Sequence, residues 1–389
     1  MAGSTSANTH GGSLTLGDCR FIDLESGAET LGSVSIVDGA VHAVGEELAP
    51  APSNDIVSLG GDFVVPGFVD IHSHVFQGVG ECVDPDQACL GRGTVLAIDG
   101  GSAGSASIDA FATIAAGFST DVQAWLNLAT IGLVDTSVGE LIPGPYLNPE
   151  EAVAAVRRHR GFVIGLKARL SSYAAGGGAH RVLRVLRQVA DEVSLPVMVH
   201  VGDTQEPLEE LLPYLRPGDV VTHALTGRRN GILTGVGALI PAISQAQESG
   251  IVFDAARGRN HLSFEVLARA FDQGFLPDTL STDMSTGVSG DPEYGLATLG
   301  DYLLAYSVPL HSVLRRMSVA PAAVVGRRLP TAIETGMAAD LTVFRLKRSD
   351  RVLRDVDNRP LKSTVTIVPT GTVRAGVYRR IPASRRAAA

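Results

Sequence analysis

The sequence predicts an α/β protein: a (β/α)8 TIM barrel with a small β-sandwich domain built from both chain ends. Between residues 62 and 330, short apolar runs alternate with segments of helical periodicity, and eight such runs fit this barrel. Residues 1–61 and 331–389 carry strand-like runs broken by Gly and Asp, so we expect them to form the two parts of the small domain. A doubly wound open sheet is the alternative, weakened because no Gly-x-Gly-x-x-Gly follows the first strand of the barrel region.

The small domain is expected to begin with a tight β-hairpin. Two β-branched runs, residues 33–37 and 40–44, flank Asp38-Gly39, a pair that favours a two-residue turn. Near the other end of the chain, we expect strands at residues 340–344, 363–368 and 372–379.

The barrel region divides into strands and helices by its periodicity. We expect its eight strands at residues 63–72, 94–99, 122–129, 162–168, 197–200, 220–223, 252–254 and 279–282. Pro66-Gly67 is expected to be the hinge where the chain leaves the small β-domain and enters the barrel. Helical periodicity separates several of them, at residues 149–158, 179–193, 208–215, 239–248 and 264–271.

Composition and charge narrow the classes of function. The 389 residues include 32 Lys and Arg against 41 Asp and Glu, and the net charge of -9 argues against a nucleic-acid or anionic-membrane surface. The sequence contains no run of about 18 uncharged apolar residues and no secretory signal pattern. The three cysteines show no C-x-x-C spacing, which favours a reducing compartment, and we expect a cytoplasmic protein.

Residues that can bind metals occur at the carboxyl ends of five predicted strands. In a barrel these ends meet at one face, where active sites form. Each residue has an ordinary explanation alone: a satisfied polar side chain, a Lys that reaches water, or an Asp that caps a helix. One shared metal site explains the whole set better, and its members are His72, His74, Lys167, His200, His223 and Asp283.

The segments around these residues resemble the amidohydrolase superfamily over the whole chain. Residues 66–74, Pro-Gly-Phe-Val-Asp-Ile-His-Ser-His, are similar to its first-strand signature, and residues 336–344 are similar to its return into the small domain. Residues 165–171, Gly-Leu-Lys-Ala-Arg-Leu-Ser, most resemble its dihydroorotase-like deacetylase branch.

The resemblance implies two divalent metal ions, Zn²⁺ by default, that share a hydroxide and polarise a substrate carbonyl. It assigns His72, His74 and Asp283 to the buried ion and His200 and His223 to the more exposed one, with Asp283 also the general base. It also implies that Lys167, carboxylated by CO₂, bridges the two ions. This is chemically coherent, because burial among cations disfavours the charged ammonium and leaves an amine that can take up CO₂.

Three further residues are expected to bind substrate. Arg169 lies two residues after Lys167 and hence on the same strand face, where it binds a substrate carboxylate or forms an ion pair with a loop carboxylate. Arg257 and His261 follow the seventh strand. Relatives often have Gly-His-Gly near Arg257-Gly258-Arg259, so the family's substrate does not transfer directly. The Gly-rich segment 99–104 is expected to be a close-packed loop rather than a phosphate cradle.

We therefore expect a binuclear metal-dependent hydrolase of the deacetylase type, which cleaves an amide or ester bond in a small, anionic molecule. A cyclic amide hydrolase of the dihydroorotase or hydantoinase kind is the alternative. A non-catalytic scaffold is more remote, because all six metal-ligand positions are filled. We also expect a homo-oligomer that binds neither nucleic acid nor membrane.

Overall fold

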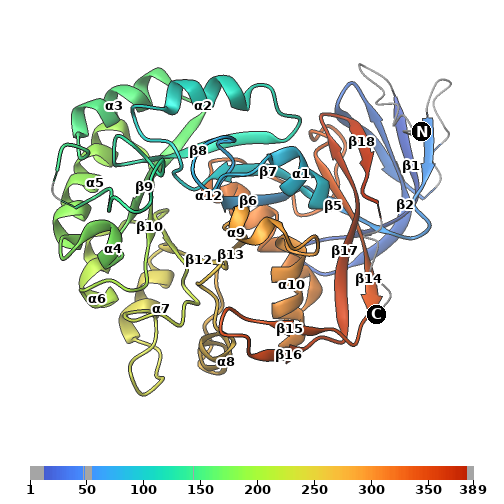
Figure 1. Cartoon of the computed structure of the whole chain (residues 1–389). Helices are drawn as coiled ribbons and strands as arrows, with labels where there is room; N and C mark the ends of the chain where they lie inside the picture. Colours follow the sequence, from blue (N-terminus) through green and yellow to red (C-terminus); the bar gives the residue numbers. More distant parts are fainter. Residues whose placement is uncertain (1–12, 47, 49–54, 143, 383–389) are drawn as a thin grey trace.

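The protein consists of a barrel and a small sheet domain packed side by side (Figure 1). The computed structural model describes residues 13–46, 48, 55–142 and 144–382. Both ends of the described chain lie in the sheet domain, and the barrel is inserted between them (Figure 1). The expected fold class is confirmed.

The small domain is one eight-stranded sheet with the order β18-β17-β14-β5-β1-β2-β3, and β4 also pairs with β1. Its pairs are antiparallel except for those of β1 with β4 and β5. Buried side chains of β1, β2, β5, β14 and β17 form a core separate from that of the barrel. The strands are β1 (Leu14–Ile22), β2 (Glu29–Val37), β3 (Ala40–Gly45), β4 (Asp55–Ser58), β5 (Phe63–Pro66), β14 (Leu341–Arg348), β17 (Val365–Arg374) and β18 (Val377–Arg380).

The predicted hairpin is present between β2 and β3. Asp38 and Gly39 both adopt positive φ, 50° and 78°, as a two-residue hairpin turn of this type requires. A separate two-stranded ribbon, β15 (Val352–Arg354) and β16 (Pro360–Lys362), follows β14 and was not predicted.

The barrel contains eight parallel strands that lie in sequence order. They are β6 (Phe68–Ser73), β7 (Thr94–Asp99), β8 (Asp121–Asn127), β9 (Val163–Arg169), β10 (Val197–His200), β11 (Val220–Thr222), β12 (Val252–Ala256) and β13 (Thr279–Ser281). A parallel bridge between Ser73 and Met284, just beyond β13, brings the last strand back to the first. Apolar side chains from five of the strands, among them Ile71 and Trp125, pack together in a common cluster.

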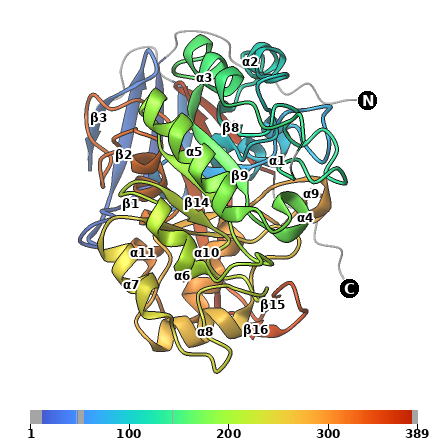
Figure 2. The same cartoon turned by 90° about the vertical axis from the view of Figure 1, so that its left-hand side faces the viewer.

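Helices surround the barrel, and Figure 2 shows α5 lying across the outer side of β9. They are α1 (Pro85–Ala88), α2 (Ile108–Ala115), α3 (Pro149–Arg158), α4 (Ser172–Ala175), α5 (Ala179–Val193), α6 (Leu208–Leu211), α7 (Pro241–Glu248), α8 (Phe264–Asp272), α9 (Thr286–Ser289), α10 (Leu296–Ala305), α11 (Leu310–Arg315) and α12 (Val319–Val324). Two 3₁₀ helices, Leu90–Arg92 and Leu212–Tyr214, complete the set. Among the described residues, no helix is long and apolar enough to cross a membrane.

The predicted first barrel strand, residues 63–72, is in fact two strands. β5 pairs with β14 in the small sheet, whereas β6 pairs with β7 in the barrel. The division falls at Gly67, whose amide donates to Asp340 O at 2.9 Å. A Cβ at this position would lie 2.2 Å from Val95 Cγ2, so only glycine allows the close contact between the two domains.

Candidate metal centre

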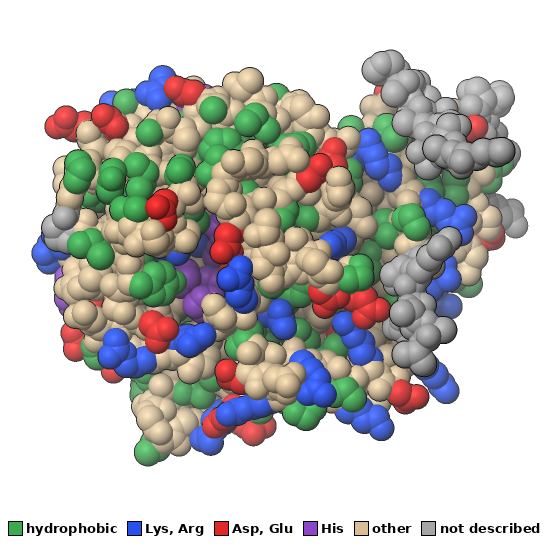
Figure 3. All heavy atoms as spheres, viewed as in Figure 1, with side chains coloured by type: hydrophobic (Ala, Val, Ile, Leu, Met, Phe, Trp, Pro, Cys, Tyr) green, Lys and Arg blue, Asp and Glu red, His purple; other side chains and the backbone are tan. Residues whose placement is uncertain are grey.

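Five of the six predicted metal-binding residues line one cavity at the carboxyl ends of the barrel strands, and the sixth, His223, packs behind His200 with ring centroids 4.3 Å apart. The cavity has a volume of about 310 Å³, a size suited to a small molecule. Figure 3 shows histidine side chains at the floor of an opening on this face of the molecule. The residues that line the cavity include His72, His74, Lys167, Arg169, His200, His261 and Asp283.

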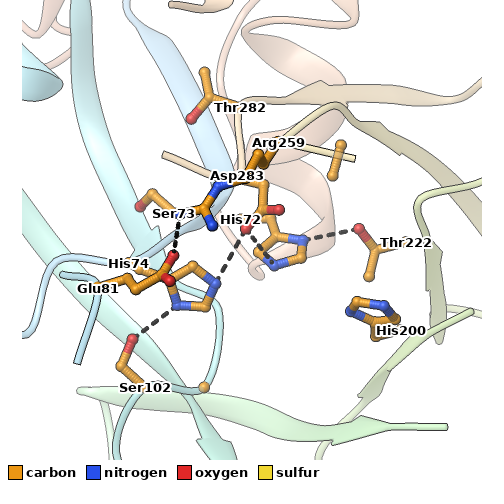
Figure 4. Close-up of polar contacts among 12 residues, drawn as sticks. His72, Ser73, His74, Glu81, Ser102, His200, Thr222, Arg259, Thr282 and Asp283 are labelled. Carbon is orange, nitrogen blue, oxygen red and sulfur yellow. Dashed lines mark hydrogen bonds and ion pairs between the residues drawn. The ribbon is translucent and has the colours of Figure 1, made fainter. Parts of the chain in front are cut away.

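The first group of possible ligands joins the end of β6 to the end of β13. Asp283 Oδ1 lies 3.1 Å from His74 Nε2 and 3.5 Å from His72 Nε2 (Figure 4). Asp283 adopts a positive φ of 52°, and its amide donates to His72 O at 2.7 Å. The backbone bonds that close the barrel therefore also bring these three side chains to one point.

The second group contains His200, His223 and His261. Its three possible ligand atoms lie within 4.8 Å of one another. His200 ends β10, His223 directly follows β11, and His261 lies in the loop after β12. The ring centroids of His72 and His223 are 5.0 Å apart, so the two groups are neighbours in a single centre.

Lys167 lies between these groups and is buried. Its Nζ is 3.2 Å from His72 Nε2 and 3.1 Å from Met198 Sδ. Burial lowers the pKa of Lys167 from 10.5 to about 7. A substantial fraction of this side chain is therefore the neutral amine near neutral pH, which is the form that can react with CO₂.

Hydrogen bonds orient three of the histidine rings. Thr222 donates its hydroxyl to Asp254 Oδ2 at 2.8 Å, so its oxygen is free to accept from His72 Nδ1, also at 2.8 Å. Ser102 Oγ is bonded to His74 Nδ1 at 2.8 Å, and His223 Nδ1 donates to a backbone carbonyl at 3.1 Å. In each ring Nδ1 is engaged and Nε2 remains available, which is a common arrangement around metal-binding histidines.

The protonation states also suit metal binding. Burial lowers the pKa values of His72, His200 and His223 well below 6.5, and the neighbouring cations and histidines lower them further. For Asp283, burial alone would raise the pKa, but His72 and His74 outweigh it and hold the pKa below 3.8. The centre therefore offers neutral imidazoles and an ionised carboxylate at neutral pH, which are the forms that bind divalent metals.

Glycines give the ligands space. A Cβ at Gly100 would lie 2.3 Å from His72 Cδ2, and one at Gly101 would lie 2.8 Å from both Cβ and Cγ of Lys167. The Gly-rich segment after β7 is thus closely packed against the centre. This packing agrees with the expectation of a close-packed loop.

The donor set fits divalent metal ions. His223 Nε2 is buried and has no hydrogen-bond partner among the described residues, a costly state for an isolated imidazole. Its ring neighbours are the imidazoles of His72, His200 and His261, and the carboxylate of Asp283 is near enough to act on it electrostatically. Imidazole and carboxylate are the ligands that Zn²⁺ and similar ions bind, so a metal would satisfy this atom.

The three predicted substrate-binding residues occupy different environments. Arg169 lines the cavity, but its Nε and Nη2 bind both carboxylate oxygens of buried Glu140 at 2.6 Å. His261 also lines the cavity, in contact with His200 and His223. Arg257 is not among the lining residues; its guanidinium lies over the ring of Tyr294, 5.1 Å from the centroid.

Sequence reasoning missed several residues that support the centre. Asp70 accepts hydrogen bonds from the amides of His72 and Thr282, and Asp254 accepts the hydroxyls of Thr222, Thr279 and Ser281. An acidic residue inside an apolar strand signals a buried partner, and both residues carry this signal. Arg259 also lines the cavity and pairs with Glu81 at 2.9 Å (Figure 4).

Comparisons with known proteins extend over nearly the whole chain. No family model matches the sequence. The chain is 30% identical to a deacetylase from Agrobacterium fabrum over 80% of its own length and 78% of that protein. It is 28% identical to a deacetylase from Brucella anthropi, over 90% of this chain and 89% of the relative.

The match to solved structures likewise extends over nearly the whole chain. A dihydroorotase, 28% identical, superimposes with a TM-score of 0.87 over 95% of this chain and 98% of its own. An adenine deaminase, 25% identical, has a TM-score of 0.87 over 94% of this chain and 99% of its own. A hydantoinase from Arthrobacter aurescens, at 15% identity and a TM-score of 0.65, shares the fold over 94% of this chain and 96% of its own.

Proposed function

Because this chain belongs to the deacetylase family of the amidohydrolase superfamily and is a metal-dependent hydrolase, we propose that it removes an acyl group from a small, anionic molecule. The bond cleaved is an amide or an ester. The observation that carries the proposal is the meeting of two groups of metal-binding side chains, with Lys167 between them, in one cavity of about 310 Å³.

Six residues would hold the metals. His72, His74 and Asp283 would hold one divalent ion, and His200 and His223 would hold the second. Lys167, carboxylated, would bridge them; its burial and lowered pKa support this role. The chemistry that two bound divalent ions supply is polarisation of the scissile carbonyl and acidification of a water molecule. Zn²⁺ is the ion we propose, because imidazole nitrogens dominate the donor set.

Asp283 is the general base in this proposal. Its carboxylate is ionised because the neighbouring histidines lower its pKa, and it faces the cavity. It would accept the proton of the attacking water and return it to the leaving amine or alkoxide. Gly258 N donates to Thr282 O at 3.0 Å, so the loop after β12 packs against Asp283 and fixes its position.

Positive charge at the cavity supports an anionic substrate. Arg259 lies at the exposed edge, where Glu81 is its ion-pair partner, and a substrate carboxylate would compete with Glu81 for it. Arg169 is already neutralised by Glu140, so a direct contact between Arg169 and substrate stays a prediction. Leu133 and Tyr173 give part of the cavity wall an apolar character that suits the body of the substrate.

A cyclic amide hydrolase is the second candidate, because the dihydroorotase structure matches this chain at a TM-score of 0.87. Both reactions use the same metal-binding residues, so the substrate pocket decides between them.

A substrate screen tests the proposal. Metal-loaded enzyme should hydrolyse at least one member of a panel of N-acetyl and O-acetyl acids, and cyclic imides should react at least tenfold more slowly. Asp283→Asn should lose most of the hydrolysis, about 10²-fold or more. Turnover of cyclic imides alone would select the second candidate. Undiminished turnover by Asp283→Asn would remove this residue from the base role.

A further inference from the structure

The ring of His261 packs directly against the rings of His200 and His223. Its ring centroid is 4.0 Å from that of His223, at an interplanar angle of 30°, and 4.8 Å from that of His200. The rings of His200 and His223, which the proposed function assigns to one metal, are themselves 4.3 Å apart. The ring of His261 is therefore closer to His223 than His200 is, and only 0.5 Å farther from His200 than His223 is.

The loop after β12 is built to bring His261 to this place. Gly258, at a φ of 51°, turns the chain beside Asp283, and the amide of His261 donates to Arg257 O at 2.9 Å. Thr226 Oγ1 is 3.4 Å from His261 Nδ1, and the amide of Thr226 donates to His223 O at 3.0 Å. One turn thus holds both the His223 backbone and the hydroxyl that faces His261.

These contacts leave the ring with a free nitrogen. Nδ1 of His261 faces the hydroxyl of Thr226, and the contacts recorded for the described residues give Nε2 no protein partner. Nε2 of His223 is likewise buried and without a partner. Two adjacent imidazoles with unused nitrogens, packed against a third, are poorly explained by hydrogen bonding and well explained by a cation that all three bind.

We propose that His261 is a third imidazole ligand of the more exposed metal ion, beside His200 and His223. This inference rests on the two-metal hydrolase proposed above and changes the expected role of His261 from substrate contact to ligand. Apart from the shared Lys167, the centre would be asymmetric: two imidazoles and a carboxylate would hold one ion, and three imidazoles would hold the other. The second position would then favour Zn²⁺ or Co²⁺ strongly over Mg²⁺ or Mn²⁺.

Metal retention tests the inference without reference to activity. Each protein, loaded with Zn²⁺, is dialysed against rising concentrations of a chelator, and metal per chain is measured by mass spectrometry. His261→Gln should lose one ion at a chelator concentration at least tenfold lower than wild type. Asn260→Ala, a change in the same loop, and His42→Gln, a change at an exposed histidine of β3, should match wild type. Equal retention by His261→Gln and wild type would overturn the proposal.

A second measurement needs no variant and covers the case in which His261→Gln does not fold. A crystal structure of the Zn²⁺-loaded wild-type protein should show an ion within about 2.1 Å of a His261 ring nitrogen. An ion bound by His200 and His223 but more than about 3 Å from His261 would overturn the proposal. If the protein binds two ions, one of them at His261, but deacylates no substrate, the proposed function is wrong and this inference still holds.

Discussion

At the scale of single residues, the centre depends on side chains that never touch the metal positions. Thr222 lies between His72 and Asp254 and hydrogen-bonds to both, at 2.8 Å each. Asp254 is fully buried and also binds the hydroxyls of Thr279 and Ser281. This chain of bonds fixes which nitrogen of His72 faces the cavity, so its loss should weaken metal binding before it weakens the fold.

Thr222→Val tests that chain. The variant keeps the shape of the side chain but removes the acceptor for His72 Nδ1, and metal affinity should fall about 10- to 100-fold. Thr279→Val is the matched control, because it removes a different hydroxyl from Asp254 and contacts no histidine. Isothermal titration of the metal-free proteins with Zn²⁺ gives the affinities. If both variants lose the same affinity, the effect belongs to Asp254 rather than to the orientation of His72.

Gly258→Ala tests the close packing of the loop on Asp283. A Cβ at this position would lie 2.0 Å from Asp283 Oδ2, so the carboxylate must move, and kcat/KM should fall at least tenfold. Gly274→Ala is the matched control: its φ is also positive, 82°, but no atom lies within 4 Å of the added Cβ. Both variants carry the strain of alanine at positive φ. Equal losses of activity would therefore attribute the effect to backbone strain alone.

The structure brings the predicted residues of the centre together, but the sequence could not predict which residues support them. His72, His200 and His223 each lie at or directly after the end of an apolar strand, which is a local pattern, and barrel geometry brings strand ends together. The hydrogen-bond partner of each imidazole ring depends instead on how strands that are distant in sequence are aligned in the barrel. Thr222 reaches His72 across 150 positions of sequence, and no local pattern encodes that distance.

At the scale of elements, α10 joins the barrel to the small sheet. Asp301 of α10 is buried and accepts the amide of Ile367 in β17 at 2.8 Å. Burial raises the pKa of Asp301 from 3.8 to about 7. The folded protein therefore binds a proton here that the unfolded chain has already released between about pH 4 and pH 7.

This difference predicts a pH dependence of stability. The contribution of Asp301 to the free energy of unfolding should fall as pH rises from about 4 to about 7, because the unfolded state holds fewer protons at this carboxyl group over that range. Asp301→Asn keeps an acceptor for Ile367 but does not titrate. The variant should lose a part of the pH dependence on the order of 2 kcal/mol between pH 5 and pH 8. Urea unfolding at both pH values measures it, and parallel changes in wild type and variant would contradict the account.

Element boundaries were predictable where local signals mark them. α3 and α5 occupy the predicted residues 149–158 and 179–193; α3 begins at Pro149 after a capping Asn148, and α5 buries one apolar face. The sequence predicts a hinge at Pro66-Gly67, where the structure divides residues 63–72, but it does not predict that residues 63–66 form a strand of the small sheet. Val64 and Val65 are as apolar as the barrel strand that follows, and only their pairing with β14 assigns them to the small sheet.

At the scale of the whole molecule, the two chain ends form a sheet domain beside the inserted barrel, and the residues that line the cavity all belong to the barrel region. The deacetylase relatives cover most of the chain, so the small sheet belongs to the shared architecture as much as the barrel does. Closure of the barrel between Ser73 and Met284 places His72 and His74 beside Asp283. The candidate metal centre is thus a consequence of the closed fold, and an open sheet would not assemble it.

The most direct test of this account is the metal content of the protein purified without chelator. Elemental analysis should find about two divalent ions per chain, mostly zinc, and Lys167→Ala should contain clearly less. Fewer than about one ion per wild-type chain would contradict the centre described above, and an unchanged content in Lys167→Ala would contradict the bridging carboxylate.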